Sequence, residues 1–336
     1  GVPVALGAPR RGPLEPPALA GFDLLELGRP APGAPWAYVK VAEGCDRACG
    51  FCAIPSFRGA QRSRSMTSVM DEVGGLLEAG VREIVLVAQD LASYGLDRTG
   101  SGGARSGGAR PIVGLTRAVS ARAARCRLLY LYPSGLTDDL IDAVLGTEVP
   151  YFDLSLQHVS RPLLARMRRV GDGGRFLARI ERIRRLEPDA TFRSSFILGY
   201  PGETEDDHDR LLAFLAEAQL DWAGFFPFSL EGGTYAEGLE DQVPPELALE
   251  RLRECAELQD AVTARRRDAM VGRTLEVLVD APGVGRTVHE APEIDGIVEV
   301  PADLATGSVV DVEIAASRGT DLVARPVRVT AGPGAR

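Results

Sequence analysis

Short apolar and β-branched runs alternate with amphipathic helical patterns from Trp36 to about Ser229. This alternation is typical of parallel strands that are joined by crossover helices. Six strand–helix units predict an α/β fold, a partial (β/α)6 barrel of the TIM type. The expected strands lie at residues 38–42, 83–88, 127–132, 151–156, 192–198 and 224–228.

The helix expected from Ser68 has the clearest boundaries. Ser68 and Asp71 have the spacing of a capping box, apolar residues recur on one face, and Gly80 is placed to end the helix. Residues 246–270 carry apolar positions among many charges and predict a surface helix that closes the first domain. Residues 95–114 have no apolar period and predict a mobile surface loop.

The apolar period changes to two in the last part of the chain. Apolar and polar residues alternate over residues 275–280 and again over 310–314, with Gly and Pro residues between the runs. Several short strands between tight turns, the last around Val327 and Val329, predict a small antiparallel β-barrel.

The domain organisation follows from length and composition. A chain of 336 residues is too long for one ordinary domain. Its opening stretch begins with Gly1, is rich in Pro, Gly and Ala, and lacks the layout of a signal peptide, so it predicts a linker. A linker with nothing folded before it indicates a fragment of a longer protein. The expected division is a linker remnant at 1–35, a first domain at 36–270 and a terminal β-barrel domain at 271–336.

The overall composition is that of a soluble protein, with 45% hydrophobic and 25% charged residues. No run approaches the ~18 apolar residues of a membrane span, so we expect a cytoplasmic protein without a membrane segment. The formal net charge is −9, and Lys40 is the only lysine. An acidic chain is a poor general binder of nucleic-acid phosphates.

Three of the five cysteines, Cys45, Cys49 and Cys52, fall in one loop just after the first expected strand. The rim of a parallel barrel carries its active site at this position. Thiolates are the usual ligands of iron–sulfur clusters, and three protein ligands leave one of four irons open for a cofactor or substrate. The spacing CxxxCxxC therefore predicts a [4Fe-4S] cluster. Cys126 and Cys255 stand alone and are expected to be small buried apolar side chains.

Two other interpretations of the cysteines remain open from the residues alone. A structural zinc site would need a fourth nearby ligand, which His158 would supply only through folding. A redox pair of Cys49 and Cys52 would leave Cys45 without a role. The corresponding functional alternative is a non-catalytic, zinc-binding, RNA-associated factor.

The CxxxCxxC motif, with Phe51 before its last cysteine, resembles that of the radical S-adenosylmethionine (SAM) superfamily. Other stretches resemble the methylthiotransferases of that superfamily, and the resemblance runs from about residue 37 to residue 330. These stretches are YVKVAEGC at 38–45, IPSFRG at 54–59, RSR at 62–64, VAQD at 87–90, LYLYP at 129–133, LQH at 156–158 and GYPGET at 199–204.

Within that family, three stretches resemble the RimO branch, which methylthiolates the β-carbon of an aspartate in small-subunit ribosomal protein twelve. They are IPSFR at 54–58, LYLYP at 129–133 and APEIDG at 291–296. The sister MiaB branch modifies tRNA adenosine. The terminal barrel is similar to the TRAM domain that both branches share.

The resemblance implies that the open iron of the cluster binds the amino and carboxylate groups of SAM. An electron delivered through the cluster then releases a 5′-deoxyadenosyl radical, so no catalytic side chain is expected beyond the cluster and SAM. The residues expected to contact SAM are Phe51, Gln89, Gln157, Arg193 and Gly199.

Position suggests a role for most of these residues. Gln89 and Gln157 follow the second and fourth expected strands, where side chains point at a ligand above the barrel. Arg193 would reach upward to pair with the SAM carboxylate, and the turn at Gly199 would lie beside the adenosine. The alternatives are polar capping of strand ends for the glutamines, a surface ion pair for Arg193 and a simple helix-entry turn for Gly199.

The resemblance also implies partners and a missing part. The partners are ribosomal protein twelve, free or in the ribosomal subunit, and an electron donor such as flavodoxin or ferredoxin. Methylthiotransferases carry an N-terminal domain whose three cysteines hold a second [4Fe-4S] cluster, and the present sequence has no residues to supply it. Complete turnover by this sequence alone is therefore not expected.

The charge of the terminal barrel favours the RimO branch over the MiaB branch. Residues 271–330 contain ten acidic residues and five Arg, a net charge of −5. An acidic surface suits a basic ribosomal protein better than tRNA phosphates. Glu290, Glu293 and Asp295, around a turn at Pro292, are expected to be exposed and to meet the partner.

Overall fold

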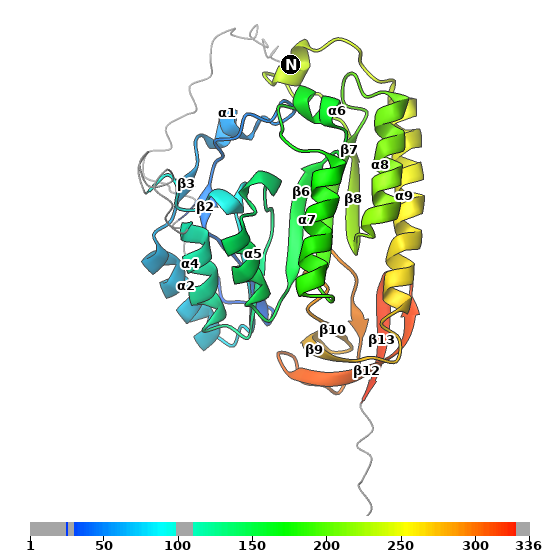
Figure 1. The fold of residues 1–336 in the computed structure, drawn as a ribbon. Coiled ribbons are helices and arrows are strands. Elements are labelled where there is room, and N and C mark those ends of the chain that lie inside the picture. Colours follow the sequence, from blue (N-terminus) through cyan, green and yellow to red (C-terminus); the bar gives the residue numbers. More distant parts are fainter. Residues whose placement is uncertain (1–24, 26–29, 99–109, 327–336) are drawn as a thin grey trace, which may run out of the picture.

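The computed structural model describes residue 25, residues 30–98 and residues 110–326. Figure 1 shows a unit of strands and helices above and a small β-barrel below. Most of the expected linker at 1–35, the central part of the expected loop at 95–114, and the strand expected around Val327 and Val329 lie outside the described residues.

Six parallel strands form the wall of the upper unit. One sheet has the order β1-β4-β5 and the other the order β6-β7-β8, and an isolated bridge between Leu131 and Leu154 joins them. Within the described residues β1 pairs only with β4 and β8 only with β7, so the barrel stays open between β1 and β8. The predicted partial barrel is confirmed. The strands are Trp36–Lys40 (β1), Glu83–Val87 (β4), Arg125–Leu128 (β5), Tyr151–Gln157 (β6), Thr191–Leu198 (β7) and Trp222–Pro227 (β8).

In strand β1, buried and half-buried side chains alternate along the chain. Ala37 and Val39 are buried in the core beneath the helices, whereas Trp36, Tyr38 and Lys40 are half-buried. Because successive side chains of a strand point to opposite faces, these three residues lie on the inner face of the barrel.

Helices cover the outer face of the wall (Figure 1). Among the described residues, no helix has both the length and the apolar character that a membrane crossing requires. The longer helices are Met66–Glu78 (α2), Pro111–Ser120 (α4), Asp138–Leu145 (α5), Gly173–Leu186 (α7), Glu205–Ala218 (α8) and Pro245–Asp268 (α9). Shorter elements are Ile54–Arg58 (α1), Arg161–Arg166 (α6), the 3-10 turns Leu91–Ser93 (η1), Pro133–Gly135 (η2) and Tyr235–Gly238 (η3), and the paired short strands Ala42–Glu43 (β2) and Arg62–Ser63 (β3).

Helix α2 begins earlier than the sequence predicted. It starts at Met66, and the hydroxyl of its cap, Ser65, accepts a hydrogen bond from the backbone N–H of Ser68 at 3.1 Å. Ser68 therefore lies inside the first turn, and the predicted capping box with Asp71 is wrong. Gly80 follows the helix with a φ of 95°, which fits its predicted place at the end.

The lower unit is a closed barrel of five strands in the order β10-β11-β13-β12-β9. Its interior is apolar and includes Val277, Val279, Val312 and Ile314, which alternate along β9 and β12 as the sequence predicted. Four strand pairings are antiparallel, but β11 pairs with β13 in parallel. The strands are Thr274–Ala281 (β9), Val284–Arg286 (β10), Val298–Glu299 (β11), Val309–Arg318 (β12) and Asp321–Pro326 (β13).

A loop of the lower barrel, residues 287–297, closes the amino-terminal end of the upper barrel. Ala291 packs in a buried cluster with inner-face residues of the strands, including Tyr151 and Trp222. The indole N–H of Trp222 donates to the carbonyl of His289 at 2.8 Å, and the Tyr38 hydroxyl donates to the carbonyl of Pro292 at 2.9 Å. The second unit thus supplies the floor of the first.

Buried ion pairs reinforce this junction. Glu83 of β4 accepts from Arg127 of β5 at 2.6 Å and from Arg286 of β10 at 2.8 Å, and all three side chains are 2% exposed or less. Burial alone would raise the pKa of Glu83, but Arg127, Arg286 and Arg125 lower it to about 2. The carboxylate is therefore charged and compensated inside the protein.

The acidic turn that the sequence predicted is mostly not exposed. Glu290 is fully buried and paired with Arg267, and Asp295 accepts from the Tyr151 hydroxyl at 2.6 Å. Only Glu293 of the three is exposed. The prediction failed because these carboxylates serve the junction between the two units, and their buried basic partners are distant in sequence.

Candidate metal centre

The three thiols lie on the loop between β2 and α1, at the carboxyl-terminal end of the parallel strands. Each of Cys45, Cys49 and Cys52 is half-exposed and none is in a disulfide. Backbone hydrogen bonds hold the loop, from Cys45 to the carbonyl of Gly59 at 3.1 Å and from Cys52 to that of Cys49 at 3.2 Å. The sequence prediction that one loop presents all three thiols fits this arrangement.

Gly44 is needed for the loop to reach this position. Its φ is 79°, and a Cβ there would lie 2.3 Å from the carbonyl oxygen of Ala60. No other residue fits both the left-handed backbone and the close approach of the two chain segments. The glycine directly before Cys45 therefore has a steric cause.

Nitrogen donors lie beside the thiols of this loop, although burial raises the pKa of both Cys45 and Cys52. A guanidinium N–H of Arg169 donates to Cys49 Sγ at 3.2 Å, and the backbone N–H of Arg47 lies 3.4 Å from Cys45 Sγ. Burial raises the pKa of the Cys52 thiol, while the backbone N–H of Ile54 and the charge of Arg169 oppose this. Binding to a metal deprotonates a thiol outright, so burial is no obstacle to coordination.

The donor set fits an iron–sulfur cluster. In such a cluster each thiolate binds a separate iron, whereas zinc gathers its ligands around one point. Within the described ranges, no three His, Cys, Asp or Glu side chains are gathered as a single ion requires. His158 is fully buried, with its Nδ1 accepting from the backbone of Ser160 at 3.1 Å.

The other two cysteines are buried, as the sequence predicted. Cys126 and Cys255 are 1% and 0% exposed. Burial raises the pKa of each thiol to about 12, so both remain protonated at neutral pH. Neither is placed to exchange with the three thiols of the loop.

An aromatic ring between two guanidinium groups adjoins the thiols. The ring of Tyr132, just after β5, has Arg47 at 4.1 Å and Arg169 at 4.2 Å from its centroid. Arg47 is neutralised by Asp90 at 2.7 Å, but no carboxylate of the described residues pairs with Arg169. Arg169 is thus a buried cation beside Cys49 with charge to offer to an anionic ligand.

The sequence did not single out this group. Arg47 lies between Cys45 and Cys49, so the sequence alone places it close to the thiols. Arg169 lies 120 residues from Cys49 and follows α6, so only the fold brings it to the thiols. No periodic or motif signal marks it.

The predicted glutamines lie at the ends of their strands. The amide of Gln89 donates to Glu43 at 3.3 Å, and its oxygen is buried without a hydrogen-bond partner among the described residues. Gln157 ends β6 with a φ of 68°, a left-handed conformation that costs energy for a residue with a side chain. An unsatisfied acceptor and a strained backbone are both typical of ligand sites.

The predicted aromatic and glycine positions have packing roles in the structure. Phe51 contacts Tyr200 edge-to-face with 6.5 Å between ring centroids. Gly199 has a φ of 79°, and a Cβ there would lie 2.5 Å from the Cβ of Ala248 in α9. These contacts neither require nor exclude a ligand, so both roles toward SAM stay predictions.

Arg193 does not lie with the thiols. It is near the beginning of β7, the end opposite to the cysteine loop, and pairs with Asp153 at 3.2 Å and Asp295 at 3.4 Å. Asp153 in turn accepts from the backbone N–H of Tyr130 at 2.9 Å. Tyr130 is left-handed with a φ of 64° and its side chain is 47% exposed, so the ion pair helps to hold a strained residue near the inner face.

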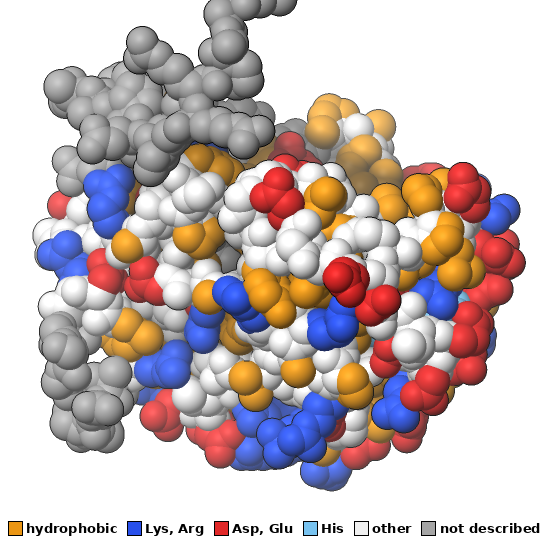
Figure 2. Space-filling view, turned by 90° about the horizontal axis from the view of Figure 1, so that it is seen from above, with side chains coloured by type: hydrophobic (Ala, Val, Ile, Leu, Met, Phe, Trp, Pro, Cys, Tyr) orange, Lys and Arg blue, Asp and Glu red, His pale blue; other side chains and the backbone are white. Residues whose placement is uncertain are grey.

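Figure 2 looks down on the end of the molecule that carries the cysteine loop. Hydrophobic side chains lie beside Lys or Arg and Asp or Glu side chains across the middle of this face.

Comparison with known proteins gives two family matches. Residues 39–215 match the Radical SAM superfamily, and residues 271–327 match the TRAM domain. Among curated proteins, the chain is 44% identical over 292 residues to "Ribosomal protein uS12 methylthiotransferase RimO" of Moorella thermoacetica, covering 84% of this chain and 65% of that protein. A protein of the same name from Histophilus somni is 41% identical over 302 residues, with 85% and 68% covered.

The chain spans 61–68% of the length of the first five curated relatives. Among solved structures, the radical S-adenosylmethionine methyltransferase TsrM from Kitasatospora setae is 15% identical, with a TM-score of 0.48. The match covers 81% of this chain and 45% of that one.

Proposed function

The chain belongs to the RimO family of uS12 methylthiotransferases within the radical SAM superfamily, and from this membership we propose that it forms the radical-generating part of such an enzyme. The proposed substrate is an aspartate of small-subunit ribosomal protein twelve, methylthiolated at its β-carbon. The observation that carries the proposal is the presentation of Cys45, Cys49 and Cys52 on one loop at the carboxyl end of the barrel strands.

The three cysteines are proposed to hold a [4Fe-4S] cluster whose fourth iron binds SAM. Such a cluster supplies the electron that cleaves SAM to methionine and the 5′-deoxyadenosyl radical. The protein side chains bind and orient SAM and exclude water. Arg169 beside Cys49 is the strongest candidate partner for the SAM carboxylate, because its charge has no carboxylate partner in the described part of the chain.

The other predicted contacts remain part of the proposal. Gln89 and Gln157 would bind SAM from the strand ends, and Phe51 and Gly199 would shape the site. Arg193 was predicted for the carboxylate, but its pairs with Asp153 and Asp295 favour a structural role. Arg169 therefore replaces it in the proposal.

The domain division and the partners are proposed as well. We propose a SAM-binding domain at 36–270, a TRAM-like barrel at 271–336 and a linker at 1–35. A second [4Fe-4S] cluster would belong to an N-terminal domain outside this sequence, and an electron donor such as flavodoxin or ferredoxin would act in the cytoplasm. The alternative tRNA substrate is not favoured, because the curated relatives from Moorella thermoacetica, Histophilus somni and Cutibacterium acnes carry the uS12 name.

The test is anaerobic reconstitution of the chain with iron and sulfide. We expect one four-iron cluster per chain, absorbance near roughly 400 nm, and cleavage of SAM to 5′-deoxyadenosine after reduction. Cys49→Ala should lose the cluster and the cleavage, whereas Cys126→Ala should keep both. Methylthiolated aspartate, detected by mass spectrometry, should form only when an N-terminal domain is present. Bound zinc without labile sulfide would refute the proposal.

A further inference from the structure

Basic side chains near the inner face of the barrel differ in how far the protein neutralises them. Arg47 has Asp90 at 2.7 Å, and Arg193 has Asp153 and Asp295 at 3.2 and 3.4 Å. These two positive charges are compensated by carboxylates of the protein itself. A compensated charge has little to offer to a ligand.

A second group, around Glu43, keeps an excess of positive charge. The Glu43 carboxylate is 3% exposed and accepts from Lys40 at 2.6 Å and from Arg58 at 3.4 Å. The amide of Gln89 donates to it as well, at 3.3 Å. Two cations share one carboxylate, so the group carries one positive charge that no carboxylate of the described residues cancels.

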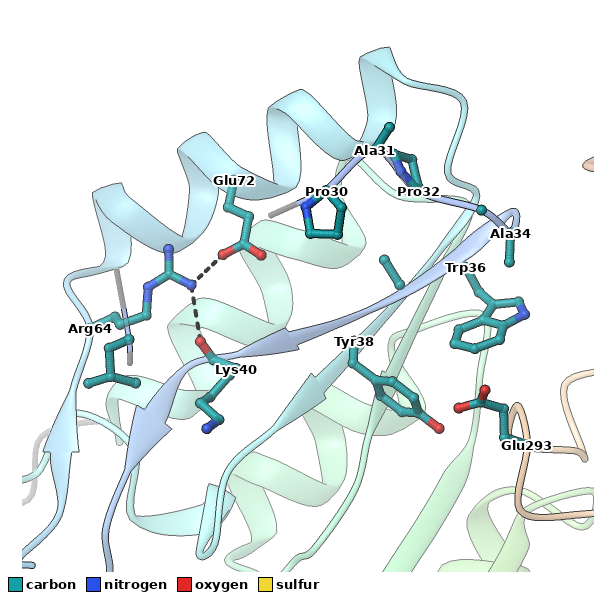
Figure 3. Close-up of a pocket in the computed structure, with 13 residues that line it drawn as sticks. Pro30, Ala31, Pro32, Ala34, Trp36, Tyr38, Lys40, Arg64, Glu72 and Glu293 are labelled. Carbon is teal, nitrogen blue, oxygen red and sulfur yellow. Dashed lines mark hydrogen bonds and ion pairs between the residues drawn. The ribbon is translucent and has the colours of Figure 1, made fainter. Parts of the chain in front are cut away.

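Lys40 is the member of this group that faces the interior of the barrel. It is the last residue of β1, shares the inner face with Trp36 and Tyr38, and is five residues before Cys45. Its side chain is 38% exposed. Figure 3 shows Trp36, Tyr38 and Lys40 on one side of β1, with Glu293 facing Trp36 and Tyr38.

These residues are part of the lining of a cavity of about 630 Å³ along the edge of β1 that pairs with no other described strand, and residues 30–34, Leu25 and Ala37 contribute to the same lining. Lys40 and Glu293 are opposite in charge, and the two other charged residues of its lining, Arg64 and Glu72, pair with each other. A segment of a basic protein that carries one acidic side chain matches this pattern, with the acid toward Lys40 and a basic neighbour toward Glu293.

We propose that Lys40 binds the carboxylate of the target aspartate. The inference rests on the proposed function, in which two carboxylates must be held at the site, one of SAM and one of the substrate. Arg169 beside Cys49 serves the first, and Lys40 serves the second. A carboxylate held by Lys40 fixes the adjacent β-carbon, the atom that is to be modified.

Lys40 suits this role better than Arg58. Lys40 projects from a strand of the wall, whereas Arg58 is the last residue of the short helix α1 outside it. When the flexible Lys40 side chain turns to a ligand, Arg58 and Gln89 still compensate buried Glu43. The exchange therefore leaves no buried charge unpaired.

The test compares two labelled peptides of ribosomal protein twelve, one with the target aspartate and one with asparagine in its place. Binding is measured by fluorescence anisotropy to the chain that carries its cluster and SAM. Lys40→Gln should weaken binding of the aspartate peptide about tenfold, because a hydrogen bond to a charged group is lost, and leave the asparagine peptide within about twofold. Lys40→Arg should restore most of the preference for the aspartate peptide over the asparagine peptide.

Arg117→Gln is the matched control, since Arg117 is exposed on α4 at the outside of the barrel and the change in net charge is the same. Arg117→Gln should reduce the affinity for both peptides slightly and to the same extent. Equal losses of both peptides in Lys40→Gln, or a loss of SAM affinity in place of peptide affinity, would overturn the assignment of Lys40 alone. If the unaltered chain binds neither peptide, or binds tRNA in their place, the proposed function fails together with this inference.

Discussion

The two ends of the upper barrel differ in whether their charged side chains are compensated by partners of opposite charge. At the amino-terminal end, Glu83, Arg127 and Arg286 are buried, and Glu83 pairs with both arginines across the domain junction. At the carboxyl-terminal end, Arg169 and the Lys40 group keep positive charge that no carboxylate of the described residues cancels. Compensated charge fixes how the two units dock, and uncompensated charge is available to ligands.

The difference also concerns access. Floor residues such as Ala291 and Tyr151 are sealed from solvent, whereas the three thiols and Lys40 are half-exposed. A buried ion pair adds little net stability compared with apolar residues, but breaking one is costly because the remaining charge stays buried. The two ends should therefore respond to mutation in different measurements.

The largest effect is expected at Glu83. Glu83→Gln leaves Arg127 and Arg286 without their shared carboxylate, and loss of one partner of a buried pair costs about 3–5 kcal/mol of unfolding free energy. Urea unfolding measures this loss, and SAM affinity of the folded fraction should not change. Glu299→Gln is the control, because both Glu299 and its partner Arg318 are exposed, and the loss of this pair should cost under about 1 kcal/mol. Similar small losses in both variants would contradict the comparison.

A pH-dependent effect is expected at Asp295 in the same floor. Burial raises its pKa from 3.8 to about 6, in spite of hydrogen bonds from Tyr151 and Ala291 and the charge of Arg193. Because the folded-state pKa is raised, the stabilising contribution is full below pH 3.8 and is lost as the pH rises through 6. Two pKa units correspond to about 3 kcal/mol.

Asp295→Asn should remove this dependence. Between pH 4.5 and 7, the unfolding free energy of the unaltered chain should fall relative to that of the variant. Asp138→Asn is the control, since a hydrogen bond from Arg182 lowers the pKa of the exposed Asp138 below 3.8, so its titration lies outside this pH range and the variant should keep the pH dependence of the unaltered chain. A constant difference between the unaltered chain and Asp295→Asn over this pH range would show that Asp295 does not titrate there.

The smallest change in free energy is expected at the open end. Arg169→Met should weaken SAM binding at least about tenfold, since a hydrogen bond to a charged group contributes about 1.5–3 kcal/mol, and should alter urea unfolding little. Arg193→Met should instead lower the free energy of unfolding and leave SAM binding little changed, because both carboxylate partners of Arg193 belong to the protein. Equilibrium binding of SAM to the cluster-bearing chain decides between them. Loss of SAM affinity in Arg193→Met alone would return the carboxylate role to Arg193.

The strands and the cysteine loop could be predicted because their signals are local. Periodicity in β1 and β9 is set by alternate burial, and the spacing of Cys45, Cys49 and Cys52 lies within one loop. Boundaries were less exact, as at Ser65, because neighbouring serines compete to cap one helix.

The charges could not be assigned from the sequence, because their partners are far away along the chain. Arg193 lies on β7 and Arg169 follows α6, and only the fold shows that the first meets Asp295 and the second meets Cys49. Glu290 was wrongly expected at the surface, because its buried partner Arg267 lies at the end of α9 and the sequence does not show that the two residues meet.

The loop at 287–297 has a consequence for modularity. Although the lower barrel has its own core, it provides the floor of the other unit and the arginine that pairs with Glu83. A chimera that exchanged the terminal barrel for that of a relative would also exchange the floor of the upper barrel, to which Tyr38 and Trp222 donate hydrogen bonds. The two units must therefore be recombined, or inherited, with their contact residues matched on both sides.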